Sequence, residues 1–588
     1  MKKQSRPAYD VVVIGSGLAG LTLSRQLLLY TDKSVLLLDR RVNPPKDAPQ
    51  KYGESLVQCS GYYLSRVLDL QEHLLINHYL KYNLRFYWPT PGLKNQSFED
   101  YSQSYSRKLS NVETYQLDRN LLEEHLLETN TSNQRCDFVG GIRDLKVELA
   151  EDGSDHQVRW SGGQVRCRWV VDASGRGSVM AKQLGLRQPN PIRHGAIFFW
   201  VEGLVDIERL TGRTHKERLY DRARQKTGQF PFFLATNHFC ADGQWFWVIP
   251  LHHKTSLGLV YEHASVNGDE VATPEKAIEY VCRKWPLFAR DLPKRKILDH
   301  GRLVDFSHGC KQTISPNRWA LVGEAGRFSD PLYSPGSDLI GIYNTQIVEA
   351  VQTEDPKALA QRCELAEVIE HVMYEAYVPG YAESYNCLGD QEAFNLKYSW
   401  ELAVYFGFYV LPMINGFYAN PDFMLPFLQL FKVLGQVNHN LQHTLSAFFR
   451  WKRRQPPRVW PEPQFFEFYD MQPLNEAETL FYQAGLTPAE GIAVIEKHLA
   501  RLQHFARYIL AHIHASVIGD PEALINGPFV SSLDIENTHF DPEAMEAAFA
   551  AHKGRGEPYR WNLNPRILAH YIAPRERAAA AAQLMKGM

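Results

Sequence analysis

Three glycines near the start of the chain are spaced to bind a phosphate group. Gly15, Gly17 and Gly20 form a GxGxxG pattern in "YDVVVIGSGLAGLTLSRQLLL", where a buried strand leads through a turn into a helix. Gly15 permits the tight turn, Gly17 lets a pyrophosphate approach the backbone, and Gly20 lets helix and strand pack closely. The helix N-terminus offers free N–H groups and a positive dipole end to the phosphates. The pattern therefore predicts a dinucleotide site.

An acidic residue follows at a distance that suits the same ligand. The next strand, "SVLLLD", ends at Asp39, where a carboxylate can bond both ribose hydroxyls. We assign Ala19, Arg40 and Arg119 to the same cofactor site. This unit could hold NAD or the ADP half of FAD.

Two later segments decide between these cofactors. "RWVVDASGRGS" (168–178) is a strand that runs into Asp172, and "RWALVGEAG" (318–326) is a strand that runs into Gly323 and Glu324. An acid at a strand end before a helix suits a ribityl hydroxyl, and the helix N-terminus suits the electron-poor edge of a flavin. Over roughly residues 8–350 the layout resembles FAD-dependent monooxygenases of the para-hydroxybenzoate hydroxylase type. That family usually has aspartate where Glu324 stands, so we expect FAD with altered geometry.

Three further motifs resemble those of the flavin-dependent halogenases. "WFWVIP" (245–250) fits WxWxIP, and "FSDPLYSPG" (328–336) fits FxxPxxSxG. "KYNLRFYW" (81–88) resembles the KxGxxFxW segment of the phenol- and pyrrole-acting members, with Asn83 where glycine is usual. The three motifs stand in the expected order.

The resemblance implies a mechanism with two sites. Reduced flavin and oxygen give a flavin hydroperoxide, which a bound chloride or bromide attacks to form hypohalous acid. The oxidant then passes through a tunnel to a lysine beside a separately bound aromatic. The residues that the resemblance assigns are Lys81 for catalysis, Trp245, Trp247 and Pro331 for the tunnel, and Ser334, Gly336 and Ser337 for the halide.

Elementary chemistry supports these roles and also offers simpler explanations. A strand would place Trp245 and Trp247 side by side on one face, where they either keep substrate from flavin or are plain core. A buried lysine has a lowered pKa, so Lys81 could polarise hypohalous acid or form a haloamine; otherwise it is a solvated lysine beside Arg85 on one strand face. Converging backbone N–H groups suit a halide, and Pro335 has no N–H to contribute. Either reading remains open at each position.

The predicted substrate is a phenol, resorcinol or pyrrole. Tryptophan-acting members place a glutamate immediately before the motif serine, and here that position is Tyr333. The substrate is either free or tethered to a carrier. Because no second dinucleotide motif follows, we expect a separate flavin reductase to supply FADH2. The alternatives are a flavin monooxygenase that hydroxylates or epoxidises its substrate, and a catalytically idle flavoprotein scaffold.

The elements that must position these residues define an α/β fold. We predict a Rossmann-like FAD-binding module interleaved with a substrate-side β-sheet over 1–355, and a mostly helical domain over 356–588 that covers the substrate cavity. Thr487 and Glu490 form a capping box at the start of a helix reaching about residue 514. Aromatic stretches such as 402–418 are either core or a lipid-facing surface. His439 and His443 could share a helix face, but no metal is expected.

Composition narrows the class further. A net charge of −2 disfavours nucleic acid as a partner. Eight scattered cysteines without a CxxC pair indicate a reducing compartment. The basic start leads into a core strand and not into a signal peptide, and no apolar run reaches the roughly 18 residues of a membrane span. We therefore expect a cytoplasmic protein.

Overall fold

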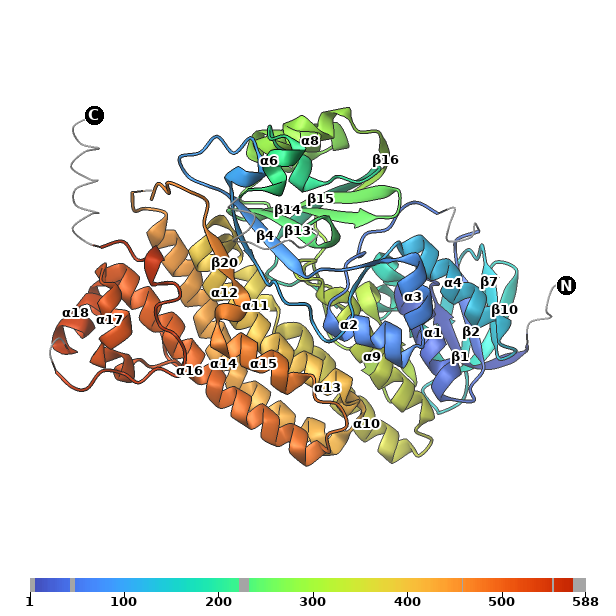
Figure 1. Cartoon of the computed structure of the whole chain (residues 1–588). Coiled ribbons are helices and arrows are strands. Elements are labelled where there is room, and N and C mark those ends of the chain that lie inside the picture. Colours follow the sequence, from blue (N-terminus) through green and yellow to red (C-terminus); the bar gives the residue numbers. More distant parts are fainter. Residues whose placement is uncertain (1–5, 43–47, 222–231, 457, 553–554, 575–588) are drawn as a thin grey trace.

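The computed structural model describes residues 6–42, 48–221, 232–456, 458–552 and 555–574. Figure 1 shows a sheet that carries the N-terminal strands, a second sheet beside it, and a large helical region that contacts the second sheet. Among the described helices, none combines the length and apolar character needed to cross a bilayer.

The first sheet is built around parallel strands whose carboxyl ends meet. Its strands in order are β18 (Ile314–Ser315), β19 (Trp319–Leu321), β10 (Gly163–Asp172), β1 (Ala8–Ile14), β2 (Val35–Asp39) and β7 (Cys136–Gly140), with β9 (His156–Trp160) and β8 (Lys146–Glu148) added beside β10. Ile14 pairs with Asp172, and Asp172 with Leu321. The segments after Ile14, Asp172 and Leu321 therefore emerge at one edge, as the dinucleotide motif requires.

The second sheet is mixed and carries the aromatic strand. Its strands in order are β16 (Ile297–Leu303), β12 (His194–Glu202), β15 (Lys254–Glu262), β14 (Gln244–Leu251), β13 (Thr236–Ala241), β4 (Leu84–Pro89), β5 (Tyr101–Tyr105) and β20 (Phe465–Glu467). Alternate residues of β14 enter different cores, because Trp245 and Trp247 lie in one hydrophobic cluster and Phe246 and Val248 in another. Two short pairs complete the strands: β11 (Arg187–Gln188) with β17 (Gly309–Cys310), and β3 (Tyr79–Leu80) with β6 (Tyr115–Gln116).

Helices of the first 355 residues lie beside these sheets, and α1 packs against α4 and α9. They are α1 (Leu18–Tyr30), α2 (Gln58–Tyr62), α3 (Gln71–Asn77), α4 (Arg119–Ser132), α5 (Val179–Gln183), α6 (His215–Leu219), α8 (Pro274–Lys284) and α9 (Pro335–Gln352), with a π-helical turn η2 (Tyr63–Val67). Short 3₁₀ turns are η3 (Phe98–Asp100), η4 (Gly175–Gly177), η5 (Ile207–Arg209), η6 (Phe232–Leu234), η7 (Gly268–Val271), η8 (Pro286–Arg290), η9 (Leu292–Lys294) and η10 (Gly323–Ala325).

The C-terminal region is helical, as expected, with one exception. Its helices are α10 (Pro356–Glu375), α11 (Val378–Ala382), α12 (Gln391–Tyr405), the π-helix η12 (Phe406–Val410), α13 (Leu411–Ile414), α14 (Pro421–Lys452), α15 (Gln472–Phe481), α16 (Pro488–Ile518), α17 (Pro521–Asn526) and α18 (Pro542–His552). Its 3₁₀ turns are η11 (Tyr385–Gly389), η13 (Phe417–Ala419), η14 (Phe468–Asp470), η15 (Pro528–Ser532) and η16 (Ala569–Tyr571). The exception is β20, which pairs with β5 and so extends the second sheet.

Two features of this region match their sequence patterns. The capping box of Thr487 and Glu490 opens α16, which continues to Ile518. All five residues of η12, in the middle of the aromatic stretch 402–418, are buried. This part of the stretch is therefore core and not a lipid-facing surface.

The strand predicted over 81–88 begins later than expected. β4 starts at Leu84, because Asn83 adopts a left-handed conformation with φ of 65°. Asparagine tolerates that region better than most residues, and glycine populates it freely, which explains why glycine is usual in the motif. Lys81 therefore does not continue the strand face of Arg85. Arg85 is itself buried, with its guanidinium between the rings of Tyr105 and Phe232.

Candidate functional site

A cavity at the carboxyl edge of the first sheet, which we call the dinucleotide cavity, contains the glycine turn. A Cβ at Gly15 would lie 2.4 Å from the carbonyl oxygen of Ala173, and one at Gly20 would lie 2.0 Å from that of Gly15. At Gly17 it would meet no described atom within 4 Å, because Gly17 lines the cavity. Two glycines are thus needed by the fold, and the third leaves open space beside the start of α1. This geometry fits a bound pyrophosphate.

Asp39 lines the same cavity at the end of β2. Its carboxylate accepts hydrogen bonds from the backbone N–H and the hydroxyl of Ser16, each at 2.7 Å, and pairs with Arg41 at 3.0 Å. Burial alone would raise the pKa of Asp39, but the hydrogen bond and charge of Arg41 outweigh it and lower that pKa to about 2. Asp39 is therefore ionised in the folded protein at neutral pH. Arg40, predicted for this site, also lines the cavity but is exposed.

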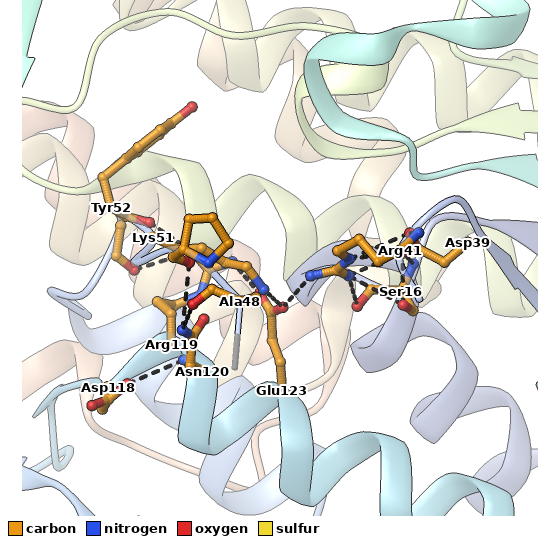
Figure 2. A network of polar contacts seen from close by, with 12 residues as sticks. Ser16, Asp39, Arg41, Ala48, Lys51, Tyr52, Asp118, Arg119, Asn120 and Glu123 are labelled. Carbon is orange, nitrogen blue, oxygen red and sulfur yellow. Dashed lines mark hydrogen bonds and ion pairs between the residues drawn. The ribbon is translucent and has the colours of Figure 1, made fainter. Parts of the chain in front are cut away.

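A buried carboxylate holds three cations along one wall of the dinucleotide cavity (Figure 2). Glu123 of α4 is fully buried and pairs with Arg119 at 2.8 Å, with Arg41 at 3.5 Å, and with Lys51. These cations overcome burial and lower the pKa of Glu123. Arg119 is the residue that the sequence analysis assigned to the cofactor. Glu123 fixes Arg119, Arg41 and Lys51 in place. These three cations together suit an anionic ligand.

Asp172 ends β10, as predicted, and its carboxylate is engaged by the turn that follows. Its carboxylate is buried and accepts hydrogen bonds from the backbone N–H groups of Ser174 at 2.9 Å and Met180 at 2.7 Å. It does not line the dinucleotide cavity, whereas Ala173 and Ser174 do. The acid at this strand end therefore holds the turn, and its contact with a ribityl chain stays a prediction. Gly20 likewise acts by packing and does not line the cavity.

Glu324 stands where the dinucleotide cavity opens into a second one, which we call the central cavity. The Tyr52 hydroxyl donates to its carboxylate at 2.9 Å, and burial raises the pKa of Glu324. Gly323, with φ of 62°, lines both cavities as well. Glu324 and Gly323 would therefore contact any ligand that extends from one cavity into the other.

The two tryptophans of β14 line the central cavity together with Pro331. Their ring centroids are 5.7 Å apart. The indole N–H of Trp245 donates to Tyr385 at 2.5 Å, and that of Trp247 to Ser256 at 3.1 Å. Both rings are therefore held by a hydrogen bond as well as by packing, which makes them a rigid surface.

The start of α9 faces the same cavity through Ser334, Gly336 and Ser337. Tyr333 and Ser334 both have left-handed backbone conformations, with φ of 68° and 61°. Two consecutive non-glycine residues in that region are strained, which is typical of functional sites. Backbone N–H groups in the first turn of a helix have no acceptor within the helix. The turn thus presents N–H donors to the central cavity, with Pro335 at the first helical position.

Lys81 lies in a third cavity, which we call the aromatic cavity. Only 5% of Lys81 is exposed, so the alternative of a solvated surface lysine is wrong. Its ammonium nitrogen donates to the Ser55 hydroxyl at 2.8 Å and to the Leu56 carbonyl. Burial lowers the pKa of Lys81 to about 7, against the smaller opposing effect of Asp338. Both protonation states are therefore accessible near neutral pH.

The aromatic and central cavities are lined by neighbouring residues at two places. Ser55 lines the central cavity and accepts the hydrogen bond of Lys81 from the aromatic cavity. Tyr333 lines the aromatic cavity, while the next residue, Ser334, lines the central one. The distorted turn before α9 and the side chain of Lys81 thus form the partition between two separate spaces.

Several site residues were missed in the sequence. Arg41, Lys51 and Glu123 carry no motif, although two basic residues directly after Asp39 were a local signal. Asp338, buried beside Lys81, accepts from the backbone of Ser60 at 2.8 Å and the hydroxyl of Tyr405 at 2.7 Å. Burial raises the pKa of Asp338 to about 6. His439 and His443 lie 3.6 and 3.3 Å from the Glu383 carboxylate and touch none of these cavities.

Sequence comparisons match part of the chain to halogenases. The family model "Tryptophan halogenase" matches residues 223–369. The flavin-dependent halogenase chlA of Dictyostelium discoideum is 27% identical over 361 residues, which cover 57% of this chain and 58% of that protein. The 1H-pyrrole-2-carbonyl-[peptidyl-carrier protein] chlorinase of Pseudomonas fluorescens is 24% identical, covering 59% and 77%.

A solved structure extends the likeness to most of the chain. Halogenase PltM in complex with phloroglucinol and FAD superimposes with a TM-score of 0.58 at 17% identity, covering 84% of this chain and 96% of that one. At this identity the match shows a shared fold. The predicted resemblance to the flavin-dependent halogenases and the predicted fold class are thus confirmed.

Proposed function

We propose that the chain is an FADH2- and O2-dependent halogenase of an electron-rich aromatic. The observation that carries the proposal is the position of Lys81, buried at the partition between the central cavity and a separate aromatic cavity. In a hydroxylase the substrate must reach the flavin. A partition that contains the Lys81 amine instead suits a small oxidant. The oxidant crosses from the central cavity, and the substrate stays in the aromatic cavity.

The dinucleotide cavity fits FAD on its own geometry. Gly17 leaves open space for the pyrophosphate, Asp39 is placed for the ribose, and Arg119 stands beside the opening to the central cavity. When bound and reduced, FAD supplies the oxygen chemistry that converts a halide to hypohalous acid. FAD-bound neighbours of the same fold and the order of the three motifs support this assignment. A separate reductase supplies the reduced flavin, since the sequence has no second dinucleotide motif.

The halide occupies the turn at the start of α9. Gly336 and Ser337 offer backbone N–H groups, and the hydroxyls of Ser334 and Ser337 stand beside them on the central cavity. A halide is large and weakly hydrated, so converging N–H donors suit it well. Trp245 and Trp247 form the facing aromatic surface and limit what else can approach.

Lys81 then polarises the hypohalous acid or captures its halogen. With two hydrogen bonds to Ser55 and Leu56 holding its nitrogen, it has either a third N–H to polarise hypohalous acid or a lone pair to capture the halogen. A pKa near 7 makes both forms available. The amine is thus positioned to transfer halogen to an aromatic ring in the adjacent cavity.

The substrate is a phenol, resorcinol or pyrrole, free or tethered to a carrier. Tyr333 stands where tryptophan-acting halogenases have a glutamate, which disfavours indole. The Pseudomonas relative acts on a carrier-bound pyrrole, and the PltM structure contains phloroglucinol, a trihydroxybenzene. These names support an activated ring as the class of substrate.

The direct experiment supplies FAD, a flavin reductase, NADH, oxygen and either chloride or bromide to the purified protein. A panel of phenols, resorcinols and pyrroles, including carrier-tethered pyrrole, serves as substrate. We expect halogen isotope pairs in the mass spectra of at least one class. Hydroxylated or epoxidised product without halogen would replace the proposal by a monooxygenase, and no oxidation of FADH2 would favour a scaffold.

A further inference from the structure

The long helix α14 forms one wall of the aromatic cavity (Figure 1). The residues of this helix that line the cavity are Phe431, Leu434, Gly435, Asn438 and Gln442. From Phe431 to Gln442 the wall runs about 16 Å along the helix axis, at roughly 1.5 Å per residue. Lys81 lines the same cavity from a different segment of the chain. The cavity is therefore longer than a single aromatic ring needs.

This wall reaches solvent at Gly435. The residue lies in the middle of α14 and is exposed, although it lines the cavity. Its neighbours on the same wall, Phe431 and Leu434, are buried. A cavity that is lined by an exposed residue opens to the surface at that residue. The aromatic cavity therefore has a mouth beside Gly435.

Packing among the described residues does not explain a glycine at this position. Inside a helix, glycine is less favourable than every residue except proline. Other helical glycines of the region are required by close approach, because a Cβ at Gly380, Gly407 or Gly491 would lie 2.6, 2.4 or 2.5 Å from a neighbouring side chain. A Cβ at Gly435 would meet no described atom within 4 Å. The missing side chain instead keeps the mouth open.

Fixed side chains flank the mouth. The Asn438 amide, one turn beyond Gly435, donates to the Ala376 carbonyl at 3.3 Å and accepts from the indole N–H of Trp400 at 2.8 Å. Because Ala376 and Asn438 both line the cavity, this contact sets one edge of the mouth. Phe431 and Leu434 supply apolar surface in the turn before Gly435. The opening is thus held by hydrogen bonds on one side and is apolar on the other, which suits a linear chain.

We propose that a linear substituent of the substrate ring leaves the aromatic cavity beside Gly435, and that Gly435 is thereby a specificity-determining residue. The inference rests on the proposed function and narrows its substrate to rings that carry such a substituent. With the ring beside Lys81, the substituent fills the remaining length of the cavity, and each methylene buried there strengthens binding. The substituent is either an alkyl chain on a free phenol or the arm that tethers a pyrrole to a carrier.

The test measures binding without turnover. The FAD-loaded, oxidised protein without reductant or halide is titrated with 5-methylresorcinol and 5-pentylresorcinol, and with methyl pyrrole-2-carboxylate and the pantetheine thioester of the same acid. Calorimetry gives each Kd. Burial of one methylene strengthens binding about 4-fold, so even partial burial of the longer chain gives a preference of at least roughly 10-fold. The pair that shows this preference identifies the substituent as an alkyl chain or a carrier arm.

Gly435→Phe is expected to weaken binding of the longer compound of that pair at least roughly 10-fold, because its ring occupies the mouth, and to leave the shorter compound unchanged. Gln436→Phe is the matched control, because Gln436 is the next residue of α14, is exposed and does not line the cavity. Gly435→Ala should raise the temperature of unfolding, since alanine favours the helix and its methyl group meets no described atom.

Equal affinity of wild type for both members of each pair overturns the proposal. So does a Gly435→Phe protein that binds every probe like wild type, or that loses short and long probes alike. A Gly435→Ala protein that unfolds at a lower temperature than wild type would assign the glycine to the fold and has the same effect. Wild type that shows the preference but yields no halogenated product contradicts the proposed function and not this site.

Discussion

Gly17→Val should abolish FAD binding without disturbing the fold. Gly17 has ordinary extended backbone angles, φ −86° and ψ −173°, so valine introduces no backbone strain. Its Cβ would meet no described atom within 4 Å, but it would enter the space beside the start of α1. At Gly20 the corresponding Cβ would lie 2.0 Å from a carbonyl oxygen, so Gly20→Val should misfold. The two glycines of one motif therefore predict opposite outcomes.

The magnitude follows from ligand linkage. A ligand at 100 times its Kd stabilises the native state by about 2.7 kcal/mol, and at its Kd by about 0.4 kcal/mol. A 100-fold or greater loss of affinity in Gly17→Val thus removes more than 2 kcal/mol of the stabilisation that FAD gives wild type. The assay is thermal unfolding of both apoproteins with and without FAD, together with flavin absorbance after gel filtration. A Gly17→Val protein that retains FAD like wild type, or whose apo form unfolds well below the wild-type apo form, refutes the reasoning.

Three other changes test separate parts of the site. Lys81→Met should raise the free energy of unfolding at pH 6 by roughly 2 kcal/mol. The pKa of Lys81 falls from 10.5 to about 7, which corresponds to a cost of about 5 kcal/mol, and the lost hydrogen bonds offset part of that gain. That gain should shrink between pH 7 and 10.5, as wild type no longer buries an ammonium; equal urea midpoints at both ends contradict it. Ser337→Pro removes one N–H donor and should raise the halide concentration for half-maximal turnover about 10-fold; an unchanged halide titration excludes that donor. Alanine at both Trp245 and Trp247 should lower halogenated product per FADH2 consumed, and a constant ratio would make the indoles packing only.

Features that depend on a single local segment could be predicted from the sequence. The turn from Gly15 to Gly20 and the acid at Asp39 depend on contacts within one βαβ unit, and their spacing alone predicts them. The aromatic strand was also predictable, because period-two alternation decides which residues share a face. Lys81 was identified from its motif, but its environment was not, since the left-handed Asn83 ends the strand pattern beside it.

Contacts between distant segments could not be read in this way. Glu123 gathers Arg41 and Lys51 only after α4 packs beside the first sheet. Asp172 resembles a ligand-binding acid in sequence, yet two nearby backbone N–H groups occupy its carboxylate. Glu401 reaches the cavity of Lys81 from more than 300 residues along the chain. Each depends on tertiary packing, which a single sequence does not encode as a local pattern.

The most direct test of the two-cavity account is Lys81→Ala, with FADH2 oxidation and halogenated product measured in the same reaction. Because the proposal places the action of Lys81 after the oxidation of the halide, halide-dependent flavin oxidation should stay near normal. Product should fall roughly 100- to 1000-fold, as when one positioned catalytic donor is lost. Lys81→Arg should fail as well, since guanidinium stays protonated and cannot capture halogen. Parallel loss of both rates would assign Lys81 to folding or to the flavin site, and full retention of product would contradict the account.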